Sequence, residues 1–538
     1  MAANLKHEGR GEVEAVENVL PCTTDHIRDM GNDLGVWECL KNNPKAIFYS
    51  FLMSVGPTAF GFDNLVVGLI ASMPGFRMVF GDTIGGKLFV PSLWLSLWNA
   101  MTAAGIVLGA ITNGYVQDRF GRRLSFTLGG VIATVGIAIC YISDRRDLLG
   151  DRRSSFLGGK IVLGVGLGVF QSTSQTYISE IAPARVRGPL LSSYTFMSVV
   201  GQLIGASIVY ARVAVLDKTS YRIPLATQWA FSLAIIIIGL IIPESPVYYL
   251  KKNNIDNAAL CYKRLYFGED HSRAIAKMKE TLDYEQANEM HGTQSSFLEC
   301  FRGVNWRRTR IAILAVSLQQ CLGMSYVGHS AYILQQAGMN VKKTLMLMQV
   351  AISVGLPANI ISWFLMDTLG RRTIILHSTI AVGFLWLASG IAGCFPNSTA
   401  LWFVGIAMII IMFTFGLGVG GAYPVLAAEV SASQLRAHTQ GIAYMTGGLS
   451  TWLFSFVVPY MFNTDEGNLG AKTSFIFAAL CALGAIVVFF EFPETKARTY
   501  RELDEMFDQM LPARKFRDYV FPHPSRCDEP SAQDANAV

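Results

Sequence analysis

Twelve apolar runs constrain the fold of this chain more than any other feature of its sequence. Each run is long enough, at about 18 residues or more, to cross the hydrocarbon core of a bilayer as an α-helix. The predicted spans are residues 46–72, 92–116, 124–142, 156–179, 189–211, 225–243, 310–335, 345–366, 373–394, 399–428, 437–462 and 472–492. They lack the alternation of apolar and polar residues that marks the strands of a membrane barrel. The sequence therefore predicts an all-α membrane protein with twelve transmembrane helices.

The composition supports this class and excludes others. Only 15% of the 538 residues are charged, whereas soluble domains carry about 25%. The net charge of +5 is mild and the basic residues lie in short loops, so no nucleic-acid partner is expected. The 9 cysteines form no CxxC pair and no His/Cys cluster, so neither a metal, a cofactor nor a disulfide framework is predicted. Because no nucleophile and base combine into a catalytic pattern, we expect a protein that is not an enzyme.

Polar segments divide the chain into five regions. The predicted regions are an N-terminal segment (1–45), a first six-helix bundle (46–243), a linker with amphipathic helices (244–309), a second six-helix bundle (310–492) and a C-terminal tail (493–538). Most of the Lys and Arg residues fall on the same side as the termini, which predicts that both termini are cytoplasmic. The basic segment 144–153 is placed outside and disagrees with that rule. Asn397 begins a glycosylation sequon on an expected outer loop, which is short for an acceptor.

An internal repeat relates the two bundles. The motif DRFGRR at 118–123 is matched by DTLGRR at 367–372, 249 residues later. A Glu-x6-Arg pair recurs with the same offset, and PESP recurs as PETK 250 residues later. Three matched motifs at nearly one offset indicate a duplicated unit. The sequence thus predicts two pseudo-symmetric six-helix bundles, which in transporters rock about a central site.

The charged residues of these motifs are candidates for a gate. We interpret them as ion pairs that hold the two halves together on the cytoplasmic side and separate when the protein opens inward. The candidate gating residues are Asp118, Arg119, Arg122, Arg123, Glu180, Arg187, Glu244, Asp367, Arg371, Arg372, Glu429, Arg436 and Glu494. The alternative is that they serve only as topology anchors. The repeated Glu-x6-Arg spacing favours a gate, because an anchor needs no carboxylate partner.

Two ionisable residues lie inside the predicted spans. A charge at the bilayer centre costs at least about 2.5–3.5 kcal/mol and so usually marks function. Asp63 in the first span and Lys160 in the fourth are expected at similar depth, in the outer half. If they pair, protonation of Asp63 would release Lys160 and couple proton movement to conformation. The alternatives are that Lys160 snorkels to the headgroups and that Asp63 caps a kinked helix.

Polar residues in the fifth and seventh spans are candidates for a cargo site. They are Gln202, Gln319, Gln320, Ser325 and His329. Amide, hydroxyl and imidazole groups suit a polyhydroxylated solute, but they also form bonds between helices, and a structural role for the histidine is equally open. Gln320 and His329 are nine residues apart, so they cannot both face one small ligand unless the helix is interrupted. Gly323 and Gly328 make such an interruption plausible.

These motifs resemble those of the sugar porter family of the major facilitator superfamily over about residues 46–510. The matching pieces are FGFD (60–63), DRFGRR (118–123), Tyr177 to Gly188, PESP (243–246), QQ (319–320), AGM (337–339), GRR (370–372), AEV (428–430) and PETK (493–496). GQL (201–203) and VPYMFN (458–463) are most similar to the fungal alpha-glucoside (maltose) permease branch. The resemblance implies the twelve-helix fold of that superfamily, a plasma-membrane carrier, and in many members proton symport. It also implies that Asp63 is the proton site and that Lys160 stands where the family usually has Arg.

The resemblance adds two positions to the cargo site and shows several departures. Thr195 stands where the family has a glutamine, and Tyr423 lies beside a proline that replaces an aromatic residue. Ser325 replaces an asparagine and His329 a tyrosine. The gating motifs are thus retained in full, whereas the polar residues that contact sugar are retained only in part.

The sequence therefore predicts a secondary active transporter that moves a sugar or glycoside by alternating access, coupled to protons. Its expected partners are the small-molecule substrate, protons and the lipid bilayer, and we expect a monomer. The alternative is a carrier or exporter of another small molecule, such as a fungal secondary metabolite. This alternative is considered because the polar residues that contact sugar in the family are retained only in part. A nutrient sensor with a transporter fold is a third interpretation, which the short C-terminal tail disfavours.

Overall fold

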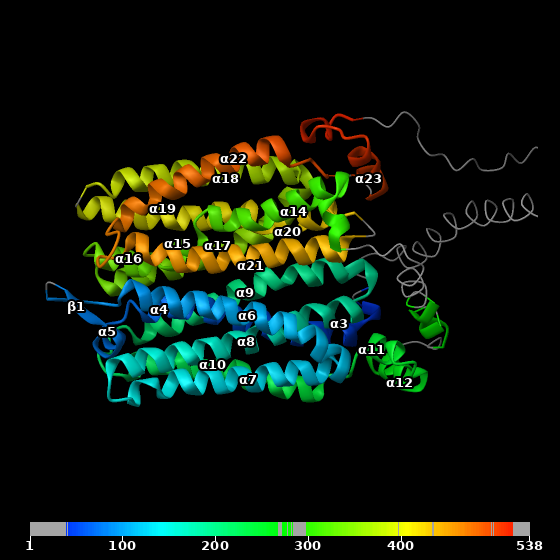
Figure 1. The fold of residues 1–538 in the computed structure, drawn as a ribbon, viewed down its shortest axis with the longest axis horizontal. Helices are drawn as coiled ribbons and strands as arrows, with labels where there is room; N and C mark the ends of the chain where they lie inside the picture. Colours follow the sequence, from blue (N-terminus) through cyan, green and yellow to red (C-terminus); the bar gives the residue numbers. More distant parts are fainter. Residues whose placement is uncertain are drawn as a thin grey trace, which may run out of the picture.

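The computed structural model describes residues 39, 41–84, 86–266, 272–276, 278–280, 282, 297–395, 397–432, 435–496, 498 and 500–519. In this part of the chain, twelve helices are long and apolar enough to cross a membrane. Figure 1 shows them as two bundles that lie side by side with their helices roughly parallel. The predicted all-α fold with two six-helix bundles is thus confirmed.

The N-terminal bundle is built from the first half of the chain. Its elements are α3 (Pro44–Met53), α4 (Val55–Ile70), α5 (Pro74–Phe80), β1 (Asp82–Ile84), β2 (Lys87–Phe89), α6 (Ser92–Phe120), α7 (Arg122–Ile142), the 3₁₀ turn η1 (Ser143–Arg145), α8 (Leu149–Ile181), α9 (Ala184–Arg212) and α10 (Thr219–Ile241). The strands β1 and β2 form an antiparallel hairpin in which Thr83 faces Leu88. Small residues bring α6 and α8 close together, because a Cβ on Gly168 would lie 2.1 Å from the carbonyl oxygen of Ile106.

The linker, the C-terminal bundle and the tail follow. Their elements are α11 (Pro246–Lys251), α12 (Ile255–Leu265), η2 (Phe297–Phe301), α14 (Gly303–Cys321), α15 (Met324–Gly328), α16 (Ser330–Gln336), α17 (Val341–Leu369), α18 (Arg371–Ala392), α19 (Ser398–Leu417), α20 (Val419–Val430), α21 (Arg436–Phe462), η3 (Gly470–Thr473), α22 (Ser474–Glu491), α23 (Tyr500–Asp508) and η4 (Ala513–Lys515). The fourth and tenth spans, Leu149–Ile181 and Ser398–Val430, have equal length and are 249 residues apart. The repeat in the sequence is therefore a repeat in the fold.

The seventh span is broken into the three pieces α14, α15 and α16. Gly323 separates the first two pieces with a φ of 85°, a left-handed conformation that glycine adopts without steric cost. The carbonyl of Leu322, freed at the break, accepts a hydrogen bond of 2.8 Å from the indole N–H of Trp386. Such compensation is needed because the membrane offers no water to a freed backbone group. The interruption that the glycines made plausible is therefore present.

The molecule has two distinct ends, which are named here by what they carry. The hairpin end carries β1, β2, α5 and α16, and the linker end carries α11, α12 and α23 (Figure 1). Between them, the outer surface of the bundles exposes large apolar side chains such as Phe364 and Phe384, at 70% and 69%. An apolar belt of this kind fits contact with lipid, as expected of a multi-pass membrane protein.

Candidate functional site

A buried ion pair lies inside the N-terminal bundle. The ammonium of Lys160 in α8 donates to both carboxylate oxygens of Asp63 in α4, at 2.6 and 2.8 Å. The amide of Gln228 in α10 donates to the same carboxylate at 3.2 Å. Asp63 and Lys160 are only 4% and 2% exposed. Since taking charges out of water is costly, each of these two buried side chains relies on the other as its counter-ion.

Among the described residues of the C-terminal bundle, this ion pair has no counterpart. The repeat offset of 249 residues aligns Lys160 with Ile409 in α19. The pair of Asp63 and Lys160 therefore distinguishes the N-terminal bundle from its structural repeat. Gln228 is a member that the sequence interpretation missed, although a polar amide inside the predicted sixth span was a signal for it.

A chain of polar side chains runs through the broken seventh span. The amide of Gln320 donates to the hydroxyl of Thr451 at 2.9 Å, and the hydroxyl of Ser325 donates to the carbonyl oxygen of Gln320 at 2.8 Å. His329 Nδ1 donates to the backbone carbonyl of Ser325 at 2.8 Å. The amide of Asn99 in α6 lies 3.3 Å from His329 Nε2. Both contacts of the ring are satisfied by the neutral tautomer with its proton on Nδ1.

The last link of this chain crosses from one bundle to the other. Asn99 belongs to the N-terminal bundle and His329 to the C-terminal bundle. Neither Asn99 nor Thr451 was singled out from the sequence, although both are polar residues in predicted spans. Gln320 and His329 are nine residues apart, but the break in the helix allows Ser325 to form a hydrogen bond with each of them.

The remaining predicted cargo residues lie on other helices. Thr195 and Gln202 are on α9, Gln319 is on α14 and Tyr423 is on α20, and all four are half-buried. In the described part of the chain, no hydrogen bond joins their side chains to the polar chain of Gln320, Ser325 and His329. The structure thus brings together one part of the predicted cargo set and leaves the other part spread over three helices.

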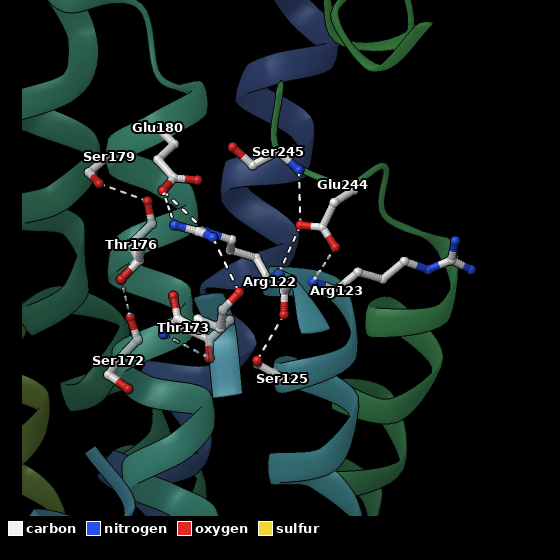
Figure 2. Close-up of polar contacts among 12 residues, drawn as sticks. Arg122, Arg123, Ser125, Ser172, Thr173, Thr176, Ser179, Glu180, Glu244 and Ser245 are labelled. Atoms are coloured by element: carbon white, nitrogen blue, oxygen red, sulfur yellow. Dashed lines mark hydrogen bonds and ion pairs between the residues drawn. The ribbon is translucent and has the colours of Figure 1, made fainter. Parts of the chain in front are cut away.

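At the linker end of the N-terminal bundle, Arg122 joins two carboxylates (Figure 2). Its guanidinium donates to Glu180 at 2.7 and 3.1 Å, and its backbone N–H donates to Glu244 at 2.8 Å. The backbone N–H groups of Arg123 and Ser245 also donate to Glu244, at 3.1 and 3.0 Å. Burial raises the pKa of Glu244 above its ordinary value, and these backbone donors oppose that rise.

The C-terminal bundle repeats this arrangement. The guanidinium of Arg371 donates to Glu429 at 3.0 Å, and its backbone N–H donates to Glu494 at 2.8 Å. Both arginines follow a glycine with positive φ, 89° for Gly121 and 90° for Gly370. A Cβ on Gly370 would lie 2.5 Å from the carboxyl carbon of Glu494, so only glycine fits between the turn and the carboxylate.

These contacts show which helices the predicted gating pairs join in this conformation. The ion pairs of Arg122 and Arg371 each join helices of a single bundle here, and a gating role stays a prediction. Each pair lies within one bundle for a local reason: α7 packs along α8 in the first bundle, and α18 packs against α20 in the second, which places each arginine beside its own carboxylate.

The other candidate gating residues lie around these pairs. Asp118 and Arg119 are exposed, and Arg436 is half-buried. Arg123 donates to the carbonyls of Gly239 and Leu240, and Arg372 donates to the carbonyl of Phe489 at 2.9 Å, again within one bundle. The side chains of Arg187 and Asp367 lie outside the described residues.

A cluster of polar contacts between the bundles lies at the hairpin end. The guanidinium of Arg77, in the last turn of α5, donates to the amide oxygen of Gln335 in α16 at 2.6 Å and lies 4.6 Å from the centre of the Tyr332 ring. The Asn463 amide donates to the carbonyl of Val90 at 2.8 Å. Further bonds join Ser92 to Asp465, Ser96 to the carbonyl of Phe456, and the Val90 N–H to Tyr332.

We call these hairpin-end contacts, from Arg77, Val90, Ser92 and Ser96 to the C-terminal bundle, the outer clasp. The sequence interpretation missed it entirely. Its members follow no repeat, and two of its acceptors, on Val90 and Phe456, are backbone carbonyls, which carry no residue signature. At the same end, the sequon residue Asn397 is exposed at the start of α19.

Known proteins match the chain over nearly its whole length. A family model described as "Sugar (and other) transporter" matches residues 49–507. The "MFS transporter fmqE" of Aspergillus fumigatus is 28% identical over 528 residues, covering 94% of this chain and 97% of the relative. A "General alpha-glucoside permease" of Saccharomyces cerevisiae is 27% identical over 514 residues, covering 93% of this chain and 82% of the relative.

A solved structure shares the fold. The inward-open conformation of the xylose transporter XylE from E. coli superposes with a TM-score of 0.70 and 20% identity, covering 86% of this chain and 99% of that one. The expected fold of the major facilitator superfamily is therefore confirmed.

Proposed function

Because the chain belongs to the sugar (and other) transporter family, we propose that it carries a sugar or glycoside across the plasma membrane by alternating access, together with protons. The resemblance to the sugar porters is confirmed by this membership and by the match to an alpha-glucoside permease. Cargo, proton coupling and orientation in the membrane are the proposal, and each is supported by a separate part of the molecule.

The cargo class is supported by the polar chain from Thr451 to Asn99. Its hydroxyl, amide and imidazole groups can exchange their mutual bonds for bonds to the hydroxyls of a solute at little net cost. Because the Asn99 to His329 link joins the two bundles at 3.3 Å, a solute that bonds to either residue competes with a contact between the bundles. Binding of cargo is thereby coupled to the arrangement of the bundles.

Coupling to protons is carried by one observation, the buried pair of Asp63 and Lys160. A proton on Asp63 removes the negative charge and leaves the Lys160 ammonium buried without its counter-ion, which favours a rearrangement that rehydrates it. Asp63 lies on α4, and the same helix touches the other bundle further along, where Gly68 meets the carbonyl of Gly328. A shift of α4 therefore reaches the bundle boundary.

The proposed orientation places both termini and the linker end in the cytoplasm and the hairpin end outside. The outer clasp then closes the outer side in this conformation. Exposed Asn397 lies on the outer side in this orientation, so a shift in electrophoretic mobility on enzymatic deglycosylation of the protein from its own host would support both the orientation and modification of this sequon.

Uptake by purified protein in liposomes tests the proposal. With a pH gradient, accumulation of a radiolabelled glucoside above its external concentration is expected, whereas Asp63→Asn should abolish accumulation and retain exchange of cargo at equal concentrations. Asp82→Asn is the matched control, because Asp82 is a half-exposed carboxylate at the hairpin end. Accumulation by Asp63→Asn equal to that of the unmodified protein would refute coupling through this residue.

A panel of cargoes tests the choice of substrate. Mono- and disaccharides are compared with apolar metabolites of similar size in the same liposomes. Transport of the sugars supports the proposal. Transport of the apolar compounds alone would replace it with a carrier for another class of small molecule.

A further inference from the structure

A basic pocket lies at the linker end, away from the ion pair and the polar chain. Its volume is about 620 Å³, within the range of roughly 300–1,000 Å³ that small ligands occupy. The side chains that define it are Lys45, Phe48, Tyr49, Ile241, Lys263 and Arg264. They come from three elements, namely α3 at the start of the first span, α10 at the end of the sixth, and α12 of the linker.

The pocket is held in place by contacts of the bundle. Helix α3 packs against both α10 and α12. The hydroxyl of Tyr266, directly after α12, donates to the carbonyl of Ile181 at the end of α8. The rings of Tyr262 and Tyr266 pack with centroids 4.5 Å apart. The last turn of α12, which carries Lys263 and Arg264, is thereby fixed beside the membrane-spanning helices.

The lining changes from apolar to basic along the membrane normal. Phe48 and Ile241 are 57% and 64% exposed and belong to membrane spans, so their surfaces face lipid. Lys263 and Arg264 are exposed on the linker, and neither forms an ion pair with a described residue. The pocket therefore places the apolar surface of Phe48 and Ile241 next to the cations of Lys263 and Arg264, where the membrane-spanning helices end. In a bilayer, this is the level at which acyl chains meet headgroup phosphates.

We propose that this pocket binds the phosphate headgroup of an anionic phospholipid in the leaflet at the linker end. The phosphate lies between Lys45, Lys263 and Arg264, and the acyl chains follow Phe48 and Ile241. This site does not depend on the identity of the cargo. It does join α12 of the linker to two elements of the N-terminal bundle that lie close to Asp63. Helix α3 leads into α4, which carries Asp63, and α10 carries Gln228.

Binding of a short-chain lipid to the full-length protein in detergent tests this site. The probe is dioctanoyl phosphatidylinositol 4-phosphate, and the test variant is Lys263→Gln with Arg264→Gln. Saturable binding to the unmodified protein is expected, and the loss of two cations should weaken it by about thirtyfold. The matched control is Lys251→Gln with Arg273→Gln, which removes two exposed cations of the linker outside the pocket and should leave binding unchanged.

Three results would overturn the proposal. One is equal binding by the test variant and the unmodified protein, with unfolding temperatures showing that both are folded. Another is equal binding of zwitterionic dioctanoyl phosphatidylcholine, which would remove the role of charge. The third is equally tight binding of soluble inositol 1,4-bisphosphate, which would assign the pocket to a free phosphate compound in place of a lipid.

Discussion

At the linker end, charged side chains join helices of the same bundle, whereas at the hairpin end polar side chains join one bundle to the other. The pairs of Arg122 with Glu180 and of Arg371 with Glu429 occur once in each half, and each joins a guanidinium Nη2 to a carboxylate Oε1. The outer clasp occurs once and uses different residues on each side. The difference indicates that the repeated networks keep each bundle rigid, while the clasp sets how the two bundles meet.

The largest effect is expected from breaking a linker-end pair. Arg122→Ala leaves the Glu180 carboxylate, 13% exposed, without its counter-ion. Removing one member of a buried pair costs about 3 kcal/mol or more, so the free energy of unfolding in denaturant should fall by that amount. The control is Arg119→Ala, an exposed arginine three residues away, with a change under about 0.5 kcal/mol. Equal losses for both would contradict a special role for the pair.

The glycine before the second pair gives the next effect. Gly370→Ala places a Cβ 2.5 Å from the Glu494 carboxyl carbon at a φ of 90°, which should destabilise the protein by about 1–3 kcal/mol. Gly114→Ala is the control, because Gly114 lies in α6 with nothing within 4 Å of its added Cβ. That control should be neutral or stabilising by about 0.5–1 kcal/mol. Thermal unfolding of the two purified variants measures the difference in stability. A lower unfolding temperature for Gly114→Ala than for Gly370→Ala would exclude this account of the turn.

Breaking the clasp should change conformation more than stability. Gln335→Ala removes the acceptor of the Arg77 guanidinium in the other bundle, which weakens the closed hairpin end by about 1–2 kcal/mol, or roughly tenfold in population. The measurement is the alkylation rate of a cysteine introduced at buried Ala331 in α16, which is not a clasp residue, followed by mass spectrometry of its peptide. Asp82→Asn breaks a pair with Arg153 inside one bundle and should not change the rate. An unchanged rate in Gln335→Ala would show that this bond does not hold the end closed.

The smallest effect is expected for an exposed pair at the linker end. Arg310 and Glu491 are 42% and 30% exposed, although their atoms are 2.6 Å apart. Solvent screening limits such pairs, so Glu491→Gln should change the unfolding free energy by less than about 0.5 kcal/mol. Denaturant titration checks this value. A loss as large as that of Arg122→Ala would mean that the number of pairs, rather than their burial, decides stability at this end.

The sequence predicted the spans well because hydrophobic length is a local property. All twelve were placed, and the repeat at 249 residues led to the two bundles and to the paired motifs. Helix ends were less accurate, as for α8, which starts at Leu149 although the apolar run was read from residue 156. The difference arises because the first turns of that helix are polar and extend beyond the apolar core.

From the sequence, the functional site could be predicted only where a residue type is rare inside a membrane-spanning helix. Asp63 and Lys160 are costly inside a membrane and so could be identified, and the structure brings them together. Asn99, Thr451 and Gln228 are tolerated in many helices, so only their spatial neighbours reveal them. Glu180 and Glu429 were identified as candidate partners of the repeated arginines. The sequence could not show that each pair lies within one bundle, because this depends on which helices are adjacent.

The most direct test of the account is a distance measurement at the hairpin end. Spin labels at Leu216 and Lys342, exposed positions on opposite bundles, are compared with labels at Arg119 and Leu240, exposed positions of the same bundle at the linker end, in a background without the native cysteines. With cargo and a pH gradient, the account predicts two distance populations for the first pair and one for the second. A single unchanged distance across the bundles, or an equal change within one bundle, would contradict it.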